Sequence, residues 1–557
     1  MCGFIGAVSA GGPKPDLGRG LPFLSRRGPD SQRVWTSSDS RVILQHARLG
    51  IVDFDGRADQ PMSDPSAGVT IAFVGEIYNY PEIRQSLPNY SYRTESDTEV
   101  ILAAYLAHGT EAFRLMRGMF IAALVDERRR RVVLVRDPIG KKPLFIGRVK
   151  GATWFGCTLT AMLASAGATP EINPDALSDY AHEGWVHPSR CLVKDFRPLS
   201  PGEVVELNWE GQELGRTDCR PLATRYPVPR SFDEAAKEIG RRLRLAIERR
   251  VEHSPVPTVL LSGGIDSTVV TAGLQEVCRK RGLPLQVLAL GSLLPWRNDE
   301  PYAREAARRL QIRLEILRIP LRRLGNRVLE ALDAQDEPLG MIAYFTLFEL
   351  VRTAKSHGRI LLTGDGGDEV FLGYGKPRDW IRSDDGSSTP DPGLSCGPPL
   401  PDWMSPWGRR TVTAQLVGHM FAKADRASAE QGVEIRCPLL DWDVMAYSRG
   451  LPHQILLAGD KMKALLKAQL EGWPERFLER PKVGFAFNMR YLWALSGYAG
   501  LRESIEPDAV AAVGETIPPA FRRRASSWSG SDIFRNFDMA WRLLALSRFL
   551  ARMRQVA

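Results

Sequence analysis

The stretch that decides the fold is "TVLLSGGIDST", residues 258–268. A short apolar run, Val259 to Leu261, leads directly into Ser262-Gly263-Gly264, and a helix is predicted to begin around Ser267. Glycines let the backbone approach a ligand closely, and a helix N-terminus presents free N–H groups with a favourable dipole. The stretch therefore predicts a pyrophosphate-binding loop, and it is not the GxxxxGK[ST] loop of kinases and GTPases.

Polar side chains beside this loop fit the same interpretation. Ser262, Ser267 and Thr268 add hydroxyl donors, and Asp266 is placed to hold a Mg²⁺ ion that offsets phosphate charge. A second stretch, "LLTGDGGDEVFLGY" (361–374), also leaves an apolar strand for a glycine turn, and it carries three carboxylates: Asp365, Asp368 and Glu369. Carboxylates beside a phosphate site require a cation between them. The structural alternatives are a glycine-rich turn at the first stretch and a solvated acidic turn at the second.

Apolar strands and helical stretches alternate around both loops. "LPLQVLAL" (283–290) is one further strand, and Ser231 with Glu234 forms a capping-box signature after a proline-containing linker at 221–230. This alternation predicts a parallel sheet covered by helices on both faces. The part of the chain after the linker is therefore predicted to be an α/β domain.

The first 210 residues or so are rich in short strands. "VTIAFVGEIYNY" (69–80) and "GMFIAALVDERRRRVVLVRDP" (118–138) are apolar or alternating runs, and the arginine-rich knot in the second is predicted to be a hairpin tip. "DTEVILAAYLAHG" (97–109) predicts a helix that ends before Gly109. We place the domains at 2–215 and 216–557.

Composition narrows the class of protein. The 557 residues are 44% hydrophobic and 25% charged, with no apolar window of the roughly 18 residues that a membrane span needs. The start lacks the features of a signal peptide, and seven scattered cysteines favour a reducing compartment, so we expect a cytoplasmic protein. The net charge of +9 is spread through the chain, which favours solvated arginine faces over a nucleic-acid partner. Residues 383–402 are predicted to form an exposed loop, with a lid as the alternative.

The extreme N-terminus, "MCG", offers a nucleophile. Removal of Met1 would leave Cys2 with a free α-amine, whose unperturbed pKa is about 8. A thiol whose own amine acts as the base needs no separate histidine. A cysteine at position 2 is weak support by itself, because chance also explains it.

Taken together, the motifs show that the chain resembles the glutamine-dependent asparagine synthetases from Cys2 to about Phe487. The matching segments are "MCGFIG", "RRGPD", "HARLGIVD", "QPM", "GEIYNY", "SDTEVIL", "RDPIGKKPL", "SGGIDS", "DEP", "GDGGDEVFLGY", "KADRASAEQGVEIRCPLLD" and "RPKVGF". The resemblance implies an α+β N-terminal-nucleophile glutaminase, an αββα sandwich, followed by an α/β ATP-pyrophosphatase domain. It also implies that ammonia passes between the two through an internal tunnel.

The resemblance assigns roles in the glutaminase. Cys2 would attack the glutamine amide, Arg48 would hold the α-carboxylate, Asp97 would take the α-amino group, and the Gly75 N–H would stabilise the oxyanion. The backbone around three further residues would line the pocket: Ile51, Val52 and Glu76.

It also assigns roles in the second domain. ATP would be held by nine residues: Leu260, Ser262, Gly263, Gly264, Asp266, Ser267, Leu290, Thr363 and Gly364. Asp266 and Asp368 would engage Mg²⁺–pyrophosphate, and Asp365 stands where some relatives carry glutamate. Lys482 would stabilise charge developing on the phosphate or in the amidation transition state. Lys463 is expected near the same site, and a solvated surface charge is the alternative for either lysine.

Val74 departs from the family pattern. The residue before this glycine is typically an asparagine whose amide completes the oxyanion hole, and valine donates no hydrogen bond. Losing one such donor costs about 10²–10³-fold in kcat, so we predict a slowed glutaminase. Two scenarios stay open. In the first, glutamine still supplies the nitrogen, and a neighbouring donor or a water replaces the missing asparagine amide. In the second, the first domain is losing its glutaminase machinery, as in β-lactam synthetases and lasso-peptide cyclases, and the synthetase uses free ammonia or another amine. Retention of Cys2, Arg48 and Asp97 favours glutamine.

The sequence therefore predicts an asparagine synthetase that uses ATP, Mg²⁺, glutamine and aspartate. The enzymatic alternative is an amide ligase for another carboxylate, such as a sugar acid, a peptide or a natural product. A nucleic-acid or regulatory binding protein with a vestigial core is a third hypothesis, and the intact SGGIDS and GDGGDE motifs argue against it. We expect no nucleic-acid or membrane partner, and the family implies a homodimer.

Overall fold

The computed structural model describes the chain except for residues 10–15, 223–225, 292–298, 321, 382–395, 481–488, 495–498, 515–520, 522–524 and 557. Most of the predicted exposed loop at 383–402 and all of Lys482 lie outside the described residues. No helix in the described part of the chain is both long enough and apolar enough to cross a membrane.

The first half of the chain forms two six-stranded sheets whose strands pair antiparallel. One sheet has the order β10-β8-β9-β1-β3-β2, with bounds β1 (Gly3–Ser9), β2 (Ser31–Thr36), β3 (Val42–Arg48), β8 (Phe145–Val149), β9 (Ala152–Gly156) and β10 (Phe196–Pro198). The other has the order β12-β11-β7-β6-β5-β4, with bounds β4 (Met62–Asp64), β5 (Val69–Ile77), β6 (Gly118–Asp126), β7 (Arg131–Arg136), β11 (Glu203–Leu207) and β12 (Glu213–Asp218).

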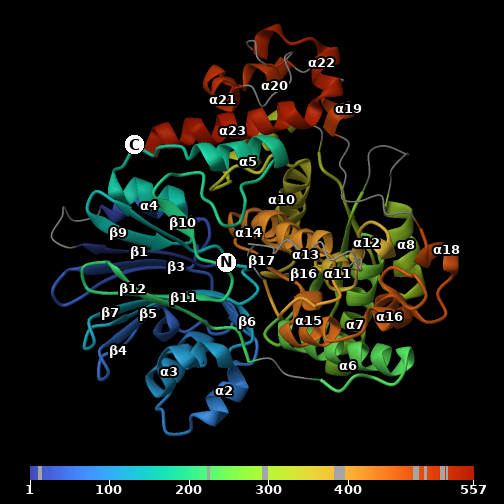
Figure 1. Cartoon of the computed structure of the whole chain (residues 1–557), viewed down its shortest axis with the longest axis horizontal. Coiled ribbons are helices and arrows are strands. Elements are labelled where there is room, and N and C mark those ends of the chain that lie inside the picture. The colour runs from blue at the N-terminus through green and yellow to red at the C-terminus, as the bar shows by residue number, and fades with distance from the viewer. Residues whose placement is uncertain are drawn as a thin grey trace.

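Helices cover the outer faces of both sheets. Helices α1 (Leu17–Ser25) and α4 (Leu159–Ala166) pack on the first sheet, and α3 (Asp97–His108) packs on β5, beside α2 (Tyr80–Ser86). The inner faces meet in an apolar core that contains Phe4, Leu44, Val74, Ile121 and Phe155. These layers are the predicted αββα sandwich, which is confirmed (Figure 1).

Local sequence explains two elements that position the first site. Helix α3 begins at Asp97 because the Ser96 side chain accepts the Thr98 N–H at 3.2 Å, and it ends where Gly109 adopts a positive φ of 60°. The predicted hairpin tip is also present, since β6 ends at Asp126 and β7 begins at Arg131. Asp97 is thereby held at the end of a helix that lies against β5.

The second half contains a parallel five-stranded sheet, as predicted. Its order is β15-β14-β13-β16-β17, with bounds β13 (Thr258–Leu260), β14 (Gln286–Leu290), β15 (Glu315–Leu317), β16 (Ile360–Leu362) and β17 (Glu434–Arg436). The main helices around it are α6 (Phe232–Arg250), α7 (Ile265–Arg281), α8 (Glu300–Arg309), α9 (Leu324–Asp333), α10 (Ile342–Ala354), α14 (Ala422–Ala429) and α15 (Trp442–Arg449).

The boundaries at the decisive loop differ slightly from the prediction. Strand β13 ends at Leu260 rather than Leu261, and α7 begins at Ile265 rather than Ser267. The earlier start follows from the first turn itself, because the Ser267 and Thr268 hydroxyls both donate to the Gly264 carbonyl oxygen. The Ser231 cap of α6 is as predicted: its hydroxyl accepts the Glu234 N–H at 3.2 Å.

The C-terminal helices close the molecule. Helix α23 (Phe537–Val556) packs against α9 and also against α4 of the first half, and Figure 1 shows it running along the junction. Helix α5 (Pro174–Glu183) belongs to the first half. The remaining helices of the second half are short: α11 (Gly367–Val370), α12 (Pro377–Trp380), α13 (Pro406–Thr413), α16 (His453–Leu457), α17 (Ala464–Lys467), α18 (Glu475–Leu478), α19 (Met489–Ala494), α20 (Ala499–Glu503), α21 (Pro507–Val513) and α22 (Gly530–Arg535).

Candidate active sites

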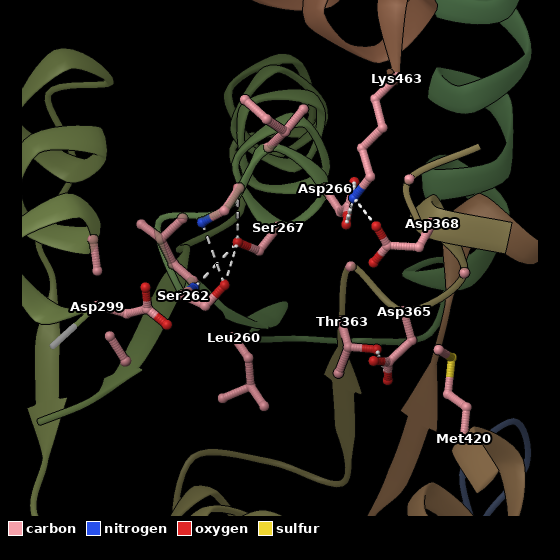
Figure 2. Close-up of a pocket in the computed structure, with 18 of the residues that line it drawn as sticks. Leu260, Ser262, Asp266, Ser267, Asp299, Thr363, Asp365, Asp368, Met420 and Lys463 are labelled. Atoms are coloured by element: carbon pink, nitrogen blue, oxygen red, sulfur yellow. Dashed lines mark hydrogen bonds and ion pairs between the residues drawn. The ribbon is translucent and has the colours of Figure 1, made fainter. Parts of the chain in front are cut away.

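A cavity of about 490 Å³ opens at the carboxyl ends of β13, β14 and β16 (Figure 2). Ten of the residues predicted for the synthetase site line it: Leu260, Ser262, Gly264, Asp266, Ser267, Leu290, Thr363, Gly364, Asp365 and Asp368. Parallel strands bring their following loops to one edge of a sheet, and ligands of such sheets bind there. Two stretches about 100 residues apart in the chain thus form one site.

Gly263 faces away from the cavity and toward α8. Its φ is +75°, and a Cβ there would lie 2.4 Å from the Ala303 backbone nitrogen. Glycine is therefore needed at this position for two reasons, the left-handed backbone and the close approach of α8. Gly263 thus shapes the loop, and its contact with ATP stays a prediction.

Hydroxyl groups organise the loop from within. The Ser262 N–H donates to Ser267 Oγ at 3.1 Å, and the two serine hydroxyls lie 3.0 Å apart. The Ser267 hydroxyl also donates to the Gly264 carbonyl at 3.1 Å. The turn is thereby held open at the N-terminus of α7, where N–H groups and hydroxyls can bind phosphate oxygens.

Lys463 lies between the two carboxylates predicted to engage the metal (Figure 2). Its Nζ is 2.8 and 2.6 Å from the two oxygens of Asp266 and 2.6 Å from Asp368 Oδ1. Burial alone would lower the pKa of this ammonium, but the two carboxylates outweigh it and raise the pKa above its usual value. Two carboxylates that converge on one cation fit Mg²⁺, whose remaining ligands would be phosphate and water oxygens.

Asp365 and several residues without a predicted role also line the cavity. The Thr363 hydroxyl donates to Asp365 Oδ2 at 2.9 Å, which orients the carboxylate. Seven polar or charged lining side chains had no predicted role: Asp299, Tyr374, His419, Lys423, Lys467, Glu479 and Arg480. Burial and the nearby Lys423 lower the pKa of His419 to about 4, so this imidazole is neutral at pH 7. A sequence signal existed for four of them, because they lie in segments that match the family: Asp299 in "DEP", Tyr374 in "GDGGDEVFLGY", Lys423 in "KADRASAEQGVEIRCPLLD" and Arg480 in "RPKVGF".

A second, much smaller cavity of about 30 Å³ surrounds Cys2. The residues predicted to handle glutamine are brought together there: Cys2, Arg48, Ile51, Val52, Gly75, Glu76 and Asp97. The Leu49 N–H donates to Cys2 Sγ at 3.2 Å. Burial raises the pKa of the Cys2 thiol, opposed by the N-terminal amine and by the Leu49 N–H. Burial also lowers the pKa of the Met1 α-amine to about 5.

The two groups predicted to hold glutamine are themselves held in place. Arg48 Nη1 donates to Asp59 Oδ1 at 3.0 Å and to the Asp55 carbonyl at 3.3 Å. Asp97 Oδ2 accepts the Ile77 N–H at 3.1 Å. Burial raises the pKa of Asp97 to about 6. A cationic and an anionic side chain at one small pocket suit the two charged groups of an amino acid.

Val74 lies behind this pocket. Its side chain is fully buried in the apolar core between the sheets, and Cys2 packs against the same core. The next residue, Gly75, has φ +137°, and a Cβ there would lie 2.0 Å from the Met119 carbonyl oxygen, so only glycine fits. The valine side chain has no donor and points into the core, so it supplies no hydrogen bond to an oxyanion in this pocket, as the sequence predicted.

Family comparisons match this arrangement. A family model described as a glutamine amidotransferase domain matches residues 1–217, and one described as asparagine synthase matches residues 238–391 and 400–550.

The chain belongs to the asparagine synthase family.

Similar proteins span both halves. A putative glutamine-hydrolysing asparagine synthetase of Mycobacterium tuberculosis is 27% identical over 89% of each chain. Asparagine synthetase 1 of Bacillus subtilis is 25% identical over 88% of each chain. Amidase chry2 of Gibberella zeae is 26% identical over 64% of this chain and 55% of its own. The protein is thus an asparagine synthetase-like glutamine amidotransferase, a glutamine-dependent ligase for which the family implies ATP, glutamine and aspartate as small-molecule substrates.

The synthetase half of this family member also enters the glutaminase pocket. Glu434, on β17, lines the cavity around Cys2. Arg436, two residues on and fully buried, donates to Glu76 Oε2 at 2.7 Å, to Glu434 Oε1 at 2.8 Å and to the Arg250 carbonyl at 2.7 Å. Sequence reasoning missed these residues, although "GVEIR" lies in a matched segment, because a contact across domains leaves no local pattern.

Proposed function

We propose that this protein is a glutamine-hydrolysing asparagine synthetase. It would activate the β-carboxylate of aspartate with ATP and amidate it with ammonia from glutamine, giving asparagine, glutamate, AMP and pyrophosphate. The observation that carries the proposal is the convergence of Asp266, Asp368 and Lys463 beside a phosphate-binding loop, in one chain with a Cys2 pocket.

In the synthetase site, the loop amides and the Ser262 and Ser267 hydroxyls would bind the ATP phosphates. Asp266 and Asp368 would hold Mg²⁺, which supplies charge neutralisation to the pyrophosphate leaving group when bound. Lys463 would then contact a phosphate oxygen in place of one carboxylate. Lys482, outside the described residues, keeps its proposed role of stabilising negative charge in the same reaction.

Asp365 is the proposed catalytic carboxylate on the acceptor side. Ammonia that attacks the acyl adenylate becomes a cation and must lose a proton to complete the amide. Asp365 lines the cavity and is oriented by the Thr363 hydroxyl, so it is placed to accept that proton.

In the glutaminase site, Arg48 and Asp97 would bind the charged ends of glutamine, and Cys2 would attack its amide. Removal of Met1 exposes an α-amine in an environment where burial lowers the pKa of an amine, so the amine would be neutral and able to take the thiol proton. Collapse of the tetrahedral intermediate would break the C–N bond, release ammonia and leave a thioester on Cys2, which water would then hydrolyse to glutamate. With Val74 in place, the Gly75 N–H would stabilise the oxyanion without a side-chain partner, and the step would be slow.

A different acceptor carboxylate is the second candidate. The relative named as an amidase supports it, because amide chemistry in similar proteins is not confined to asparagine by name. Other lining side chains, such as His419 and Lys467, lie outside the segments that match the family. Activation by ATP would be unchanged, and only the carboxylate would differ.

The test is pyrophosphate release by purified protein with ATP, Mg²⁺ and aspartate, with glutamine or ammonium chloride supplied in parallel. Asparagine, identified by mass spectrometry, is expected from both nitrogen sources. Pyrophosphate release that does not depend on aspartate would overturn the choice of acceptor. The proposal includes a cytoplasmic location, a homodimer and a domain boundary near residue 215.

A further inference from the structure

The backbone of the nucleophile is held by an arginine that follows α1. Arg27 Nε donates to the Cys2 carbonyl oxygen at 3.2 Å, and Arg27 is only 5% exposed. Its side chain lies over the next residue, since a Cβ on Gly3 would be 3.0 Å from Arg27 Cδ. The orientation of this guanidinium therefore bears directly on where the Cys2 main chain, and with it the thiol, is placed.

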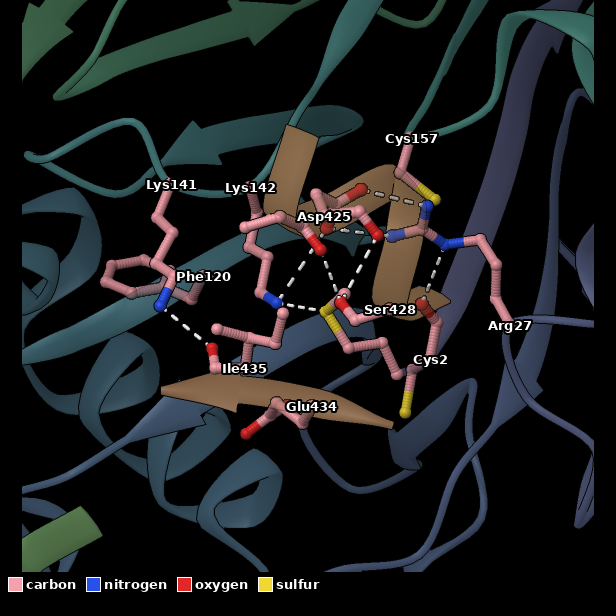
Figure 3. A network of polar contacts seen from close by, with 12 residues as sticks. Cys2, Arg27, Phe120, Lys141, Lys142, Cys157, Asp425, Ser428, Glu434 and Ile435 are labelled. Carbon is pink, nitrogen blue, oxygen red and sulfur yellow. Dashed lines mark hydrogen bonds and ion pairs between the residues drawn. The ribbon is translucent and has the colours of Figure 1, made fainter. Parts of the chain in front are cut away.

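The other two nitrogens of this guanidinium are bound by the synthetase half. Arg27 Nη1 and Nη2 donate to the two oxygens of Asp425, on α14, at 3.0 and 3.3 Å (Figure 3). Lys142 Nζ lies 3.8 Å from the same carboxylate, and Asp425 is 4% exposed. Burial alone would raise the pKa of Asp425, but Arg27 and Lys142 outweigh it and hold the pKa below its usual value.

A buried ion pair is a poor source of stability, because desolvation offsets most of its attraction. A two-pronged arginine–carboxylate contact does, however, fix the plane and rotation of the guanidinium. With Nη1 and Nη2 fixed by Asp425, Nε points at the Cys2 carbonyl. The chain Asp425–Arg27–Cys2 thus connects a helix of one domain to the reacting residue of the other.

We propose that Asp425 is a positioning residue for the Cys2 nucleophile, so that the glutaminase works at full rate only when the synthetase domain is docked against it. This inference rests on the proposed function, because it concerns the rate of the glutamine reaction. It assigns Asp425 no contact with glutamine, with ATP or with the acceptor.

The chain offers a matched control one residue away. Arg26 pairs with Glu430 at 3.4 Å across the same interface, where Glu430 caps the C-terminal end of α14 and Asp425 lies in its first turn, but neither Arg26 nor Glu430 contacts Cys2. Asp425→Asn and Glu430→Gln both remove one carboxylate charge from this junction at nearly constant volume. A general weakening of the interface would affect both variants, whereas loss of Cys2 positioning would affect only the first.

For Asp425→Asn in the full chain, glutaminase kcat is expected to fall about 10- to 100-fold, because a displacement of about 1 Å in a reacting group can cost a factor of 100. The KM for glutamine and the ammonium-driven release of pyrophosphate should stay within about twofold. Asp425→Glu should recover part of kcat, and Glu430→Gln should leave it unchanged. Equal losses in Asp425→Asn and Glu430→Gln, or equal losses with glutamine and ammonium, would overturn the proposal.

A double variant, Arg27→Met with Asp425→Asn, distinguishes a loss of stability from a loss of positioning. It removes the buried cation that Asp425→Asn alone leaves unpaired. Its melting temperature is expected to recover relative to Asp425→Asn alone, while its kcat stays low. Recovery of kcat together with the melting temperature would contradict positioning.

Hydrogen–deuterium exchange of the N-terminal peptide that contains β1 gives a readout that needs no glutaminase activity. Exchange should rise in Asp425→Asn and not in Glu430→Gln, and an unchanged peptide would overturn the proposal. A wild-type protein that hydrolyses no glutamine would refute the glutamine branch of the proposed function, and the exchange result would still decide the positioning role.

Discussion

The two candidate active sites of this protein differ in volume and in the elements that form them. The cavity around Cys2 measures about 30 Å³ and is closed by strands, by the end of α3 and by β17 of the other domain. The synthetase cavity measures about 490 Å³ and is formed by loops after parallel strands. The first is narrow, and the charged groups that line it are themselves fixed. The second has room for a nucleotide together with an acceptor, so the choice of acceptor depends on the second site.

The two sites also differ in how far each depends on its own domain. The synthetase cavity is lined by residues from 260 to 480, all within the second half. The glutaminase pocket includes Glu434, and its Glu76 and Cys2 are reached by Arg436 and, through Arg27, by Asp425. The difference indicates that the synthetase half can work with free ammonia, whereas the glutaminase is completed by its partner domain.

The largest expected effect is from Cys2→Ala, which separates the two sites. Glutamine-driven pyrophosphate release should fall more than about 10³-fold, because the nucleophile is lost. Ammonium-driven release should stay within about twofold. Cys157→Ala, which removes another buried thiol from the same core, serves as the control and should leave both reactions nearly unchanged. Loss of the ammonium reaction in Cys2→Ala would mean that the sites are not independent.

Asp266→Ala should disable the synthetase reaction and leave the glutaminase reaction intact. Pyrophosphate release with either nitrogen source is expected to fall about 10³-fold, because one of the two carboxylates that converge on the cation is removed. Glutamate release from glutamine without ATP should be unchanged. Asp266→Asn keeps the volume and should lose nearly as much, since charge is what the site requires. Turnover of ATP to AMP at the wild-type rate would show that the synthetase site is wrongly assigned.

Val74→Asn is expected to raise glutaminase kcat by up to about 10²-fold, because an amide donor would join the Gly75 N–H. The same change places a polar group in the apolar core, which should lower the free energy of unfolding by about 1–3 kcal/mol unless the amide finds a partner. Val74→Ala, which adds no donor, should not raise the rate. Stopped assays of glutamate release and a thermal melt measure both effects. An unchanged rate in Val74→Asn would refute the oxyanion explanation.

The smallest effect concerns pH and the glutamine pocket. Burial raises the pKa of Asp97 to about 6, so its carboxylate is charged above that pH and can bind the α-ammonium of glutamine. Glutaminase kcat/KM should therefore fall about tenfold per pH unit below 6, chiefly through KM, and stay flat above it. Asp97→Asn should have a high KM for glutamine at all pH values, and its kcat/KM should not fall below pH 6 in this way. A pH profile of kcat/KM in Asp97→Asn that matches the wild-type profile would show that Asp97 does not bind glutamine.

Local patterns were enough for much of the fold and for most of each site. Helix α3 and the tip between β6 and β7 follow from caps and charge patterns, because those are interactions between near neighbours. The ends of β13 and α7 were off by one or two residues, since hydroxyl contacts within the first turn set the boundary. Lys463 was expected near the phosphate site, but its place between two carboxylates depends on residues that are 95 or more positions away.

The sequence by itself determined the two domain types, and it predicted the phosphate-binding loop, the nucleophile and the missing donor at Val74, because each is a property of a contiguous stretch. Tertiary structure alone decided that Asp425 holds Arg27, that Arg436 binds Glu76 and that Glu434 enters the Cys2 pocket. Each of these contacts joins residues more than 350 positions apart, and the packing of two domains brings them together. Charged groups buried at such an interface need partners, and only the folded chain shows which partner each one has.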